Sequence, residues 1–160
     1  MGTISNNEKL AFLKKGKEAE MEFAKLFKDA VSSTESEDIY DHIDVKINTN
    51  VDIKQIKKNK RANNDVNENI HWIEIKGITG HPGWAYGKSD FFSFELKDYW
   101  IVVAKEDLHN FIEKNIIKEW VKTPDEALYK LYRREGRKDI ITLVTSYDLC
   151  YISTIMIKKY

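Results

Sequence analysis

The chain has 160 residues, and its 42% hydrophobic and 12% aromatic content suits one folded domain rather than a disordered polymer. Its 26 basic and 26 acidic residues cancel, which argues against a protein that coats nucleic acid indiscriminately through a basic surface. No apolar run approaches the roughly 20 residues of a membrane span, and the single cysteine, Cys150, suits a reducing compartment, so we expect a cytoplasmic protein without a membrane partner.

The first half of the chain predicts one helix followed by three strands. Over residues 7–31, apolar side chains recur at helical spacing, and the flanks are rich in Lys and Glu. Three later segments alternate apolar and polar residues with the period of two that strands require: 42–47, 51–57 and 70–76. A polar, Asn-rich loop joins the second segment to the third, so we expect these two strands to form a hairpin with an exposed tip.

The second half predicts a mixture of strands and helices after a glycine-rich stretch over residues 77–87. The expected elements are a strand or short helix over 89–95, a buried strand over 99–104, an amphipathic helix over 106–121, a short helix from Pro124 to about residue 134, and a strand over 140–144. The apolar tail over 149–157 is ambiguous. No repeat or linker divides the chain, so residues 1–160 are expected to form a single domain, an α/β sandwich around a mixed sheet.

Charged residues on the second and third predicted strands carry the strongest chemical signal. Glu74 and Lys76 lie two residues apart and therefore on the same face of their strand. Asp52 projects from one face of the preceding strand, with Lys54 beside it. If these strands pair with those faces together, two carboxylates converge, and Mg²⁺ or Mn²⁺ would offset their repulsion. A neighbouring lysine can then orient a metal-activated water and neutralise a phosphate, which predicts phosphodiester hydrolysis.

Glu20 adds a third acidic group from the first predicted helix. It lies with Gly16, Phe23 and Phe27 on one face of that helix, which is the apolar face. A carboxylate there is costly unless a partner or a metal compensates its charge. Two interpretations stay open: Glu20 reaches water at the edge of the apolar stripe, or it belongs to a site with the downstream acids, which we favour.

Glu20 on a helix, Asp52 on one strand and Ile73-Glu74-Ile75-Lys76 on the next resemble the PD-(D/E)XK nuclease superfamily, which includes restriction endonucleases and Holliday-junction resolvases. The resemblance implies a restriction-endonuclease-like core, a mixed β-sheet flanked by helices in the order α-β-β-β-α-β. Residues 7–104 would supply this core. Val51 stands in place of the proline in the superfamily's name.

By this resemblance the chain is a Mg²⁺-dependent endonuclease that acts on DNA. The implied roles are metal binding by Asp52, Glu74 and the carbonyl of Ile75, action on the attacking water by Lys76, and assistance to the metal or its waters by Glu20. The chain is also similar to small phage-type nucleases in segments that include Gly83-Trp84, Ser89-Asp90 and residues 134–139. This implies a role in phage or mobile-element DNA processing, where a homodimer would supply two active sites for two strands.

Alternatives remain for both the site and the function. Asp44 followed by Asp52-Ile53-Lys54 satisfies the same pattern with a shorter gap, so two strands each offer an acid-x-lysine pair. The version that ends in Glu74 and Lys76 is favoured because its strand is more apolar and is followed by glycines, and Asp44 is kept as a reserve ligand. The chain could instead be a catalytically inactive nuclease-like fold that binds nucleic acid or protein, or an α/β domain whose acids form surface ion pairs.

Two basic clusters are candidate contacts to the DNA backbone. The first consists of Lys54, Lys57, Lys58, Lys60 and Arg61, and the second contributes Arg134 and Arg137. Either cluster could equally be a solvated surface. Trp84 and Tyr86 in the glycine-rich stretch could stack on an unpaired base, or they could hold their loop against the core, which is favoured.

Overall fold

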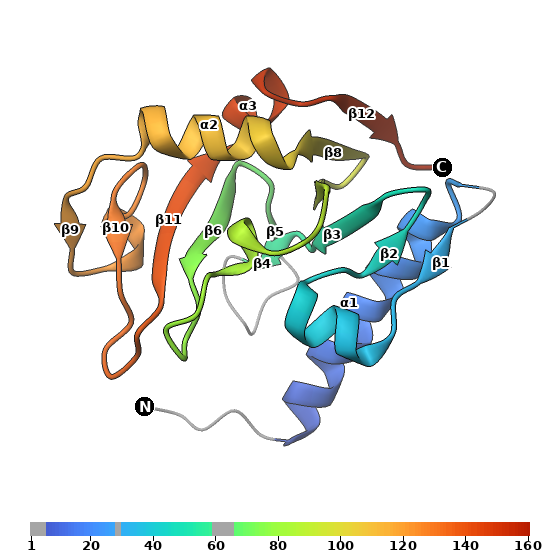
Figure 1. The fold of residues 1–160 in the computed structure, drawn as a ribbon, viewed down its shortest axis with the longest axis horizontal. Helices are drawn as coiled ribbons and strands as arrows, with labels where there is room; N and C mark the ends of the chain where they lie inside the picture. Colours follow the sequence, from blue (N-terminus) through green and yellow to red (C-terminus); the bar gives the residue numbers. More distant parts are fainter. Residues whose placement is uncertain (1–5, 28–29, 59–65) are drawn as a thin grey trace.

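The computed structural model describes residues 6–27, 30–58 and 66–160, which form a mixed α/β structure with few helices (Figure 1). The helical segments are α1 (Asn6–Ala24), η1 (Glu37–Asp41), η2 (Trp84–Tyr86), α2 (Lys105–Asn115), η3 (Pro124–Glu126) and α3 (Ser146–Tyr151). The strands are β1 (Val31–Ser32), β2 (Val45–Lys46), β3 (Asn50–Lys54), β4 (Lys57–Lys58), β5 (Val66–Asn67), β6 (Ile70–Lys76), β7 (Phe91–Glu95), β8 (Tyr99–Ala104), β9 (Trp120–Val121), β10 (Leu131–Tyr132), β11 (Ile140–Thr145) and β12 (Ile155–Lys158).

The described strands assemble into two mixed sheets and one short ribbon. The larger sheet has the order β1-β2-β3-β7-β8-β12, and the smaller has the order β6-β11-β10-β9. Each of them contains one parallel pair, β3 with β7 and β9 with β10, among antiparallel neighbours. In Figure 1 the smaller sheet lies on the left and the larger one on the right, and β4 pairs with β5 at the end of a hairpin.

Alternation along β7 and β8 gives the larger sheet two buried faces. On one face, Phe23 of α1 packs edge-to-face on Trp100 of β8, with ring centroids 5.2 Å apart, and both side chains are fully buried. On the other face, Phe92 and Phe94 of β7 pack with Leu108 of α2 and with strand β6. Because burying each large apolar side chain contributes roughly 1.5–3 kcal/mol, these layers fix α1 on one side of the sheet and the smaller sheet on the other.

The predicted pairing of the second and third strands is wrong. The two short strands on either side of the loop pair as expected, with Lys57 opposite Asn67 across β4 and β5. Beyond the tip the two arms separate. β3 pairs with β2 and β7, whereas β6 pairs with β11. Partners distant in the sequence therefore displace the local pairing, and the alternation of either strand alone does not reveal them.

Two predicted helices also differ from the structure. The helix expected over 106–121 ends at Asn115, because Ile116 adopts an extended conformation and the chain continues into β9. The helix expected from Pro124 to about 134 is one short turn, η3, after which Tyr129 takes a positive φ of 56°. The segment over 89–95 forms strand β7. Helix α2 comes after β8 in the chain, so the helical segment described between β6 and β8 is the short η2. The ambiguous tail forms the second half of α3 and most of β12.

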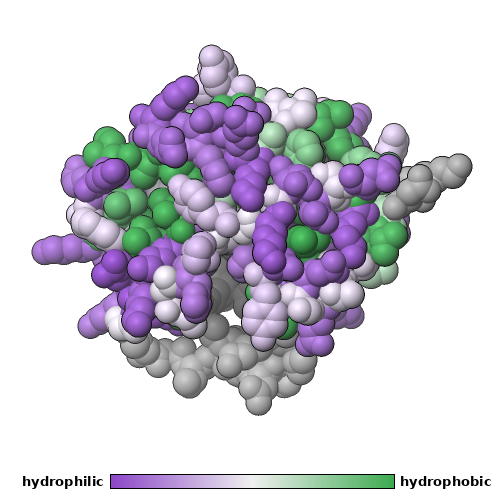
Figure 2. Space-filling model, in the orientation of Figure 1, coloured by the Kyte–Doolittle hydropathy of each residue, from purple (hydrophilic) through white to green (hydrophobic). Residues whose placement is uncertain are grey.

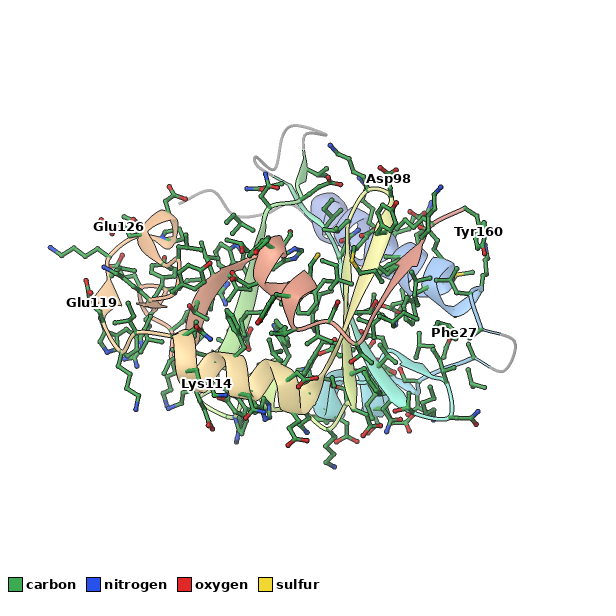
Figure 3. The ribbon with its side chains drawn as sticks, turned by 90° about the horizontal axis from the view of Figure 1, so that it is seen from above. Phe27, Asp98, Lys114, Glu119, Glu126 and Tyr160 are labelled. Atoms are coloured by element: carbon green, nitrogen blue, oxygen red, sulfur yellow. The ribbon has the colours of Figure 1, made fainter. Side chains whose placement is uncertain are left out.

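The face seen in Figure 2 is mostly hydrophilic, with apolar patches on its left side, where β9 and β10 lie in Figure 1. Exposed apolar side chains near this end include Ile117, Trp120 and Leu128. In the view from above, Glu119 and Glu126 mark this end of the molecule, opposite Phe27 and Tyr160 (Figure 3). None of the helices in the described residues is long and apolar enough to cross a membrane.

Candidate functional site

Strand β3 carries Asp52 and Lys54 on the inner face of the larger sheet. The parallel register places Asp52 beside Phe92 and Lys54 beside Phe94 of β7, so the four side chains share the face that looks toward β6. Asp52 is only 1% exposed, which is unusual for a carboxylate. The Lys54 ammonium forms an ion pair with Asp52 Oδ1.

Asp44 brings a second carboxylate to the same strand. Asp44 directly precedes β2, whose antiparallel register pairs Val45 with Val51 of β3. The Asp44 amide donates a 3.1 Å hydrogen bond to the carbonyl of Val51. Its Oδ2 atom accepts a 2.5 Å hydrogen bond from the amide of Ile53, the residue between Asp52 and Lys54. The hairpin therefore fixes the Asp44 carboxylate beside the Asp52-Ile53-Lys54 tripeptide.

The charge on Asp52 is only partly compensated. Burial raises the pKa of Asp52 well above its usual value, and the Asp44 carboxylate raises it further, while Lys54 lowers it. Asp52 Oδ2 is buried and has no hydrogen-bond partner among the described residues. A buried acceptor beside a second carboxylate is costly, and a cation bound by both would remove that cost.

Glu20 approaches Asp44 from α1, the helix that packs on the Val51 and Ile53 face of the larger sheet. It accepts a 2.8 Å hydrogen bond from Lys17, which also binds Asp38 at 3.0 Å. Burial raises the pKa of Glu20, Lys17 lowers it, and the Asp44 carboxylate raises it again. The Asp44 carboxylate therefore lies close enough to Glu20 to raise the pKa of Glu20, and we call Glu20, Asp44 and Asp52 the acidic cluster.

The acidic cluster has the chemistry of a magnesium or manganese site that is partly formed by water. Hard divalent cations prefer carboxylate oxygens, and Mg²⁺ keeps several waters when the protein supplies one or two carboxylates. Asp44 and Asp52 offer such a pair, and the unpartnered Oδ2 of Asp52 is a ready acceptor for a cation. Within the described residues, no group of three or more His, Cys, Asp or Glu side chains is placed to hold a metal ion together.

Glu74 and Lys76 come from a different sheet than Asp44 and Asp52. They lie on β6, in the smaller sheet, whereas Asp52 lies on β3 of the larger one. The carbonyl of Ile75 accepts a 3.0 Å hydrogen bond from Gly83, and Lys76 forms a β-bridge with Pro82. The segment around Gly83 therefore packs closely against β6 at the backbone to which the resemblance assigns metal binding.

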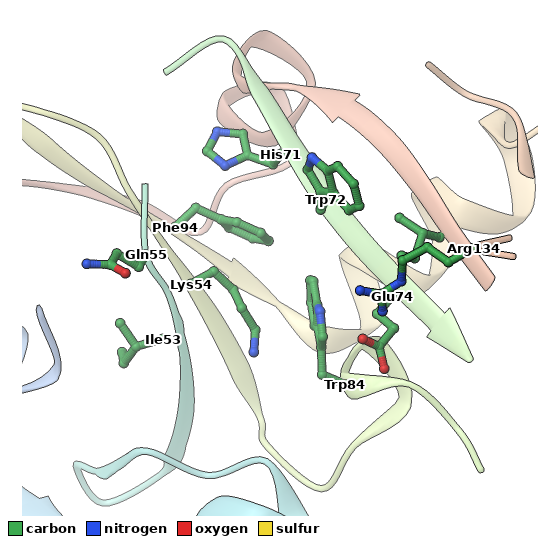
Figure 4. A pocket seen from close by; sticks show the side chains of 10 residues that line it. Ile53, Lys54, Gln55, His71, Trp72, Glu74, Trp84, Phe94 and Arg134 are labelled. Atoms are coloured by element: carbon green, nitrogen blue, oxygen red, sulfur yellow. The ribbon is translucent and has the colours of Figure 1, made fainter. Parts of the chain in front are cut away.

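A cavity of about 340 Å³ separates β3 from β6. It is lined by Ile53, Lys54, Gln55, His71, Trp72, Glu74, Trp84, Phe94, Arg134 and Ile141. In Figure 4, Trp84 lies between Lys54, which enters from β3, and Glu74, which enters from β6. Lys54 Nζ lies 4.4 Å from the centre of the Trp84 ring, a cation–π contact. Lys54 therefore takes part in both the acidic cluster and this cavity.

Arg134 reaches the same cavity from the segment before β11. Its guanidinium forms an ion pair with Asp139, whose side chain is fully buried. Asp139 Oδ1 is buried without a hydrogen-bond partner among the described residues. The five-residue separation of Arg134 and Asp139 gave no sign of this pair in the sequence, because it depends on how the chain turns into β11.

The remaining residues that the sequence singles out lie in different parts of the structure. Arg137 is exposed, whereas Lys60 and Arg61 lie outside the described residues, as do the side chains of Lys57 and Lys58. Asp90 binds the hydroxyl of Thr49 and the amide of Asn50, so it holds the β2–β3 turn. Trp84 packs on Phe92 at 5.2 Å, and Tyr86 stacks on His109 at 4.5 Å, as expected if both residues hold their loop on the core.

His42, at the end of η1, is a further neighbour of Asp44 and Lys54. Burial lowers the pKa of His42, and the Lys54 ammonium lowers it further. Its backbone adopts a left-handed conformation, with φ of 54°, at the end of η1. The imidazole therefore stays neutral at pH values where a free histidine is partly charged.

Comparison with family models, curated proteins and solved structures finds no match for this chain. Its function is therefore inferred from the residues and their geometry.

Proposed function

We propose that this protein is a metal-dependent nuclease that hydrolyses phosphodiester bonds of DNA, with Asp44, Asp52 and Lys54 at its centre. The observation that carries the proposal is the buried Asp52 carboxylate, which has one oxygen on Lys54 and the other without a partner among the described residues. The neighbouring Asp44 carboxylate makes a cation the natural complement of this pair.

The arrangement supports a version of the PD-(D/E)XK pattern that is shifted along the chain. Helix α1 supplies Glu20, the residue before β2 supplies Asp44, and β3 supplies Asp52-Ile53-Lys54. In this assignment Lys54 takes the role first expected of Lys76. The restriction-endonuclease-like core is part of the same proposal, with α1 on one face of the sheet that carries the acids.

Each charged residue of the site would have its own role in hydrolysis. Asp44 and Asp52 would hold Mg²⁺ or Mn²⁺, which supplies Lewis acidity and lowers the pKa of a bound water. Lys54 would donate to a non-bridging phosphate oxygen and neutralise the charge that accumulates during attack. Glu20 would accept the proton of the attacking water, because burial makes its carboxylate more basic than a free one. The water oxygen bonds to phosphorus, and the bond from phosphorus to the leaving alkoxide breaks.

A catalytically inactive module remains the competing interpretation, and one observation favours it. Lys54 pairs with Asp52 in the structure, and such an ion pair can serve folding alone. Under that interpretation the acidic cluster would bind metal weakly or not at all, and loss of Lys54 would change stability but no reaction.

The decisive experiment compares two lysine variants of the purified protein on supercoiled, single-stranded and branched DNA with Mg²⁺, Mn²⁺ or EDTA. We expect metal-dependent cutting that falls by at least roughly 100-fold in Lys54→Ala and stays near the wild-type rate in Lys76→Ala. Asp44→Asn and Glu74→Gln form a second matched pair, in which the first should abolish cutting. If Lys76 and Glu74 prove essential while Lys54 and Asp44 do not, the centre lies on β6. If no DNA or RNA is cut with either metal, the protein is the inactive module.

A further inference from the structure

The cavity between β3 and β6 combines aromatic walls with cations and a polar rim. Its lining includes two indoles, Trp72 and Trp84, and the ring of Phe94. At about 340 Å³ it falls at the small end of the roughly 300–1,000 Å³ range of ligand pockets. A double helix cannot enter a space of this size, whereas a single nucleotide can.

Two residues that line the cavity, His71 and Phe94, are held in place by contacts within the protein. His71 is buried, and its Nε2 atom lies 2.9 Å from Ser146 Oγ, which in turn donates to the carbonyl of Glu68. The His71 ring packs edge-on against Phe94 with centroids 5.3 Å apart. The walls are therefore held in place by packing and hydrogen bonds, as a preorganised binding site requires.

Cations enter the cavity from two opposite elements. Lys54 comes from β3, and Arg134 comes from the segment before β11 (Figure 4). The fully buried Asp139 carboxylate holds the Arg134 guanidinium in place. The Arg134 side chain is still 34% exposed and can donate to a further anion. Gln55 adds an amide, which both donates and accepts hydrogen bonds.

These features together select one class of ligand. A nucleobase has two apolar faces that stack on indoles and a polar edge that an amide can read, and its phosphates are anions that Lys54 and Arg134 can bind. We propose that this cavity binds one unpaired nucleotide of the DNA substrate, with the base against Trp72 and a flanking phosphate on Arg134. This inference rests on the proposed nuclease function and gives it a substrate class.

The position of Lys54 connects the cavity to the proposed catalytic centre. The same ammonium binds Asp52 and lies over Trp84, so a nucleotide in the cavity has its neighbouring phosphate beside the acidic cluster. A base can occupy the cavity only when it is out of its stack, which costs least in single strands, junctions and ends. The protein therefore acts on DNA at unpaired or branched positions and cuts next to the captured base.

Binding in EDTA tests the cavity separately from cleavage. A fluorescein-labelled oligothymidylate and its duplex with oligoadenylate are titrated with wild-type protein and with Trp72→Leu. The single strand should bind wild type more tightly than the duplex, and Trp72→Leu should weaken single-strand binding about tenfold and leave the duplex unchanged. Trp120→Leu is the matched control, because Trp120 is exposed and contacts Arg133 instead of the cavity. Trp72→Phe keeps an aromatic face and should bind with intermediate affinity, which covers the case in which the leucine variant fails to fold.

A second pair of variants tests the arginine. The double variant Arg134→Gln with Asp139→Asn removes both charges together, so that no buried carboxylate is left alone. It should weaken single-strand binding and make it less dependent on salt, whereas Arg133→Gln should change it less. Equal binding of single strand and duplex by the wild type, or unchanged binding by both Trp72 variants, would overturn the cavity proposal. Neither result would affect the metal-dependent cutting by which the nuclease function itself is judged.

Discussion

The carboxylate of Asp44 accepts a 2.5 Å hydrogen bond from the backbone amide of Ile53. This bond joins the residue before β2 to the centre of the Asp52-Ile53-Lys54 tripeptide, so the β2–β3 hairpin fixes two acids and a lysine as one unit. Because the amide belongs to the backbone, the position of the Asp44 side chain does not depend on the rotamer of either neighbouring side chain. A metal site built on this unit would be preorganised on two strands rather than on a loop.

The metal-free protein should become more stable when Asp52 is replaced by Asn. Burial raises the pKa of Asp52 above its usual value near 3.8. A carboxyl with a higher pKa in the folded chain contributes stability below its unfolded pKa, and this contribution is lost as the pH rises through the folded pKa. Asn does not ionise, so the Asp52→Asn variant does not lose this stability. Its unfolding free energy should exceed that of the wild type by an amount that grows with pH and reaches the order of 1 kcal/mol at neutral pH.

Urea unfolding in EDTA from about pH 4 to pH 8 measures this difference. The same proteins are then melted with and without Mg²⁺. The wild type should gain melting temperature from the metal, and Asp52→Asn should gain less, because it lacks one carboxylate. A destabilisation of Asp52→Asn that is constant across the pH range would show that the Lys54 ion pair outweighs the cost of burying the charge.

The pKa of Glu20 should rise when Lys17 is replaced by Met. The Lys17 ammonium donates a 2.8 Å hydrogen bond to Glu20 and thereby lowers the pKa that burial raises. Carbon-detected NMR titration of the Glu20 carboxyl measures the change. Lys17 is 60% exposed, so stability should fall by less than about 1 kcal/mol. Lys14→Met is the control, since Lys14 lies 4.0 Å from Glu18 and both side chains are largely exposed. An unchanged Glu20 titration would mean that the contact does not persist in solution.

The fold could be predicted from the sequence where the signal is local. The alternation over residues 70–76 and the apolar run from Tyr99 to Ala104 give β6 and β8 their observed bounds. The assembly of strands could not be predicted in this way, because β7, one partner of β3, and β11, the partner of β6, lie tens of residues away in the chain. A parallel neighbour such as β7 is joined to β3 by a long connection, which leaves no turn signal between them.

For the candidate site, too, the local pattern could be predicted from the sequence and the spatial assembly could not. Asp44, Asp52 and Lys54 are close in the sequence, and their pattern was recognised there as the reserve version of the motif. The choice between that version and the one that ends at Lys76 depends on how β3 and β6 assemble in space, which local periodicity does not encode, and the cutting assay on the two lysine variants decides it. The ion pair of Arg134 with Asp139 was not anticipated for a different reason, because a buried acid in a charged segment looks the same as a solvated one.

Replacement of Gly83 by Ala should disrupt the loop that covers the lower part of β6. A Cβ atom at Gly83 would lie 2.2 Å from the carbonyl oxygen of Glu74, which is backbone and cannot move aside cheaply. We expect a loss on the order of 2–3 kcal/mol in unfolding free energy. Gly16→Ala is the matched control, because a Cβ there meets nothing within 4 Å on the helix α1, and it should stabilise by about 0.5–1 kcal/mol. Comparable thermal melts for both variants would contradict the tight packing of Gly83 on β6.

Loss of the Asp139 carboxylate should cost more stability than loss of an exposed acid in a similar ion pair. Asp139 is fully buried and binds the Arg134 guanidinium, so Asp139→Ala leaves a partly buried cation without its partner. Breaking a buried pair costs about 3–5 kcal/mol, and the 34% exposure of Arg134 should bring the loss to the lower end of that range. Glu119→Ala removes the acid of the Lys130 pair, which is 2.8 Å long but 56% exposed at the carboxylate, and should cost less than about 1 kcal/mol. Chemical denaturation of the two variants beside the wild type measures the difference. Equal losses would mean that water reaches Asp139 in solution, and Arg134 would then lack the fixed position in the cavity that its proposed contact with a phosphate requires.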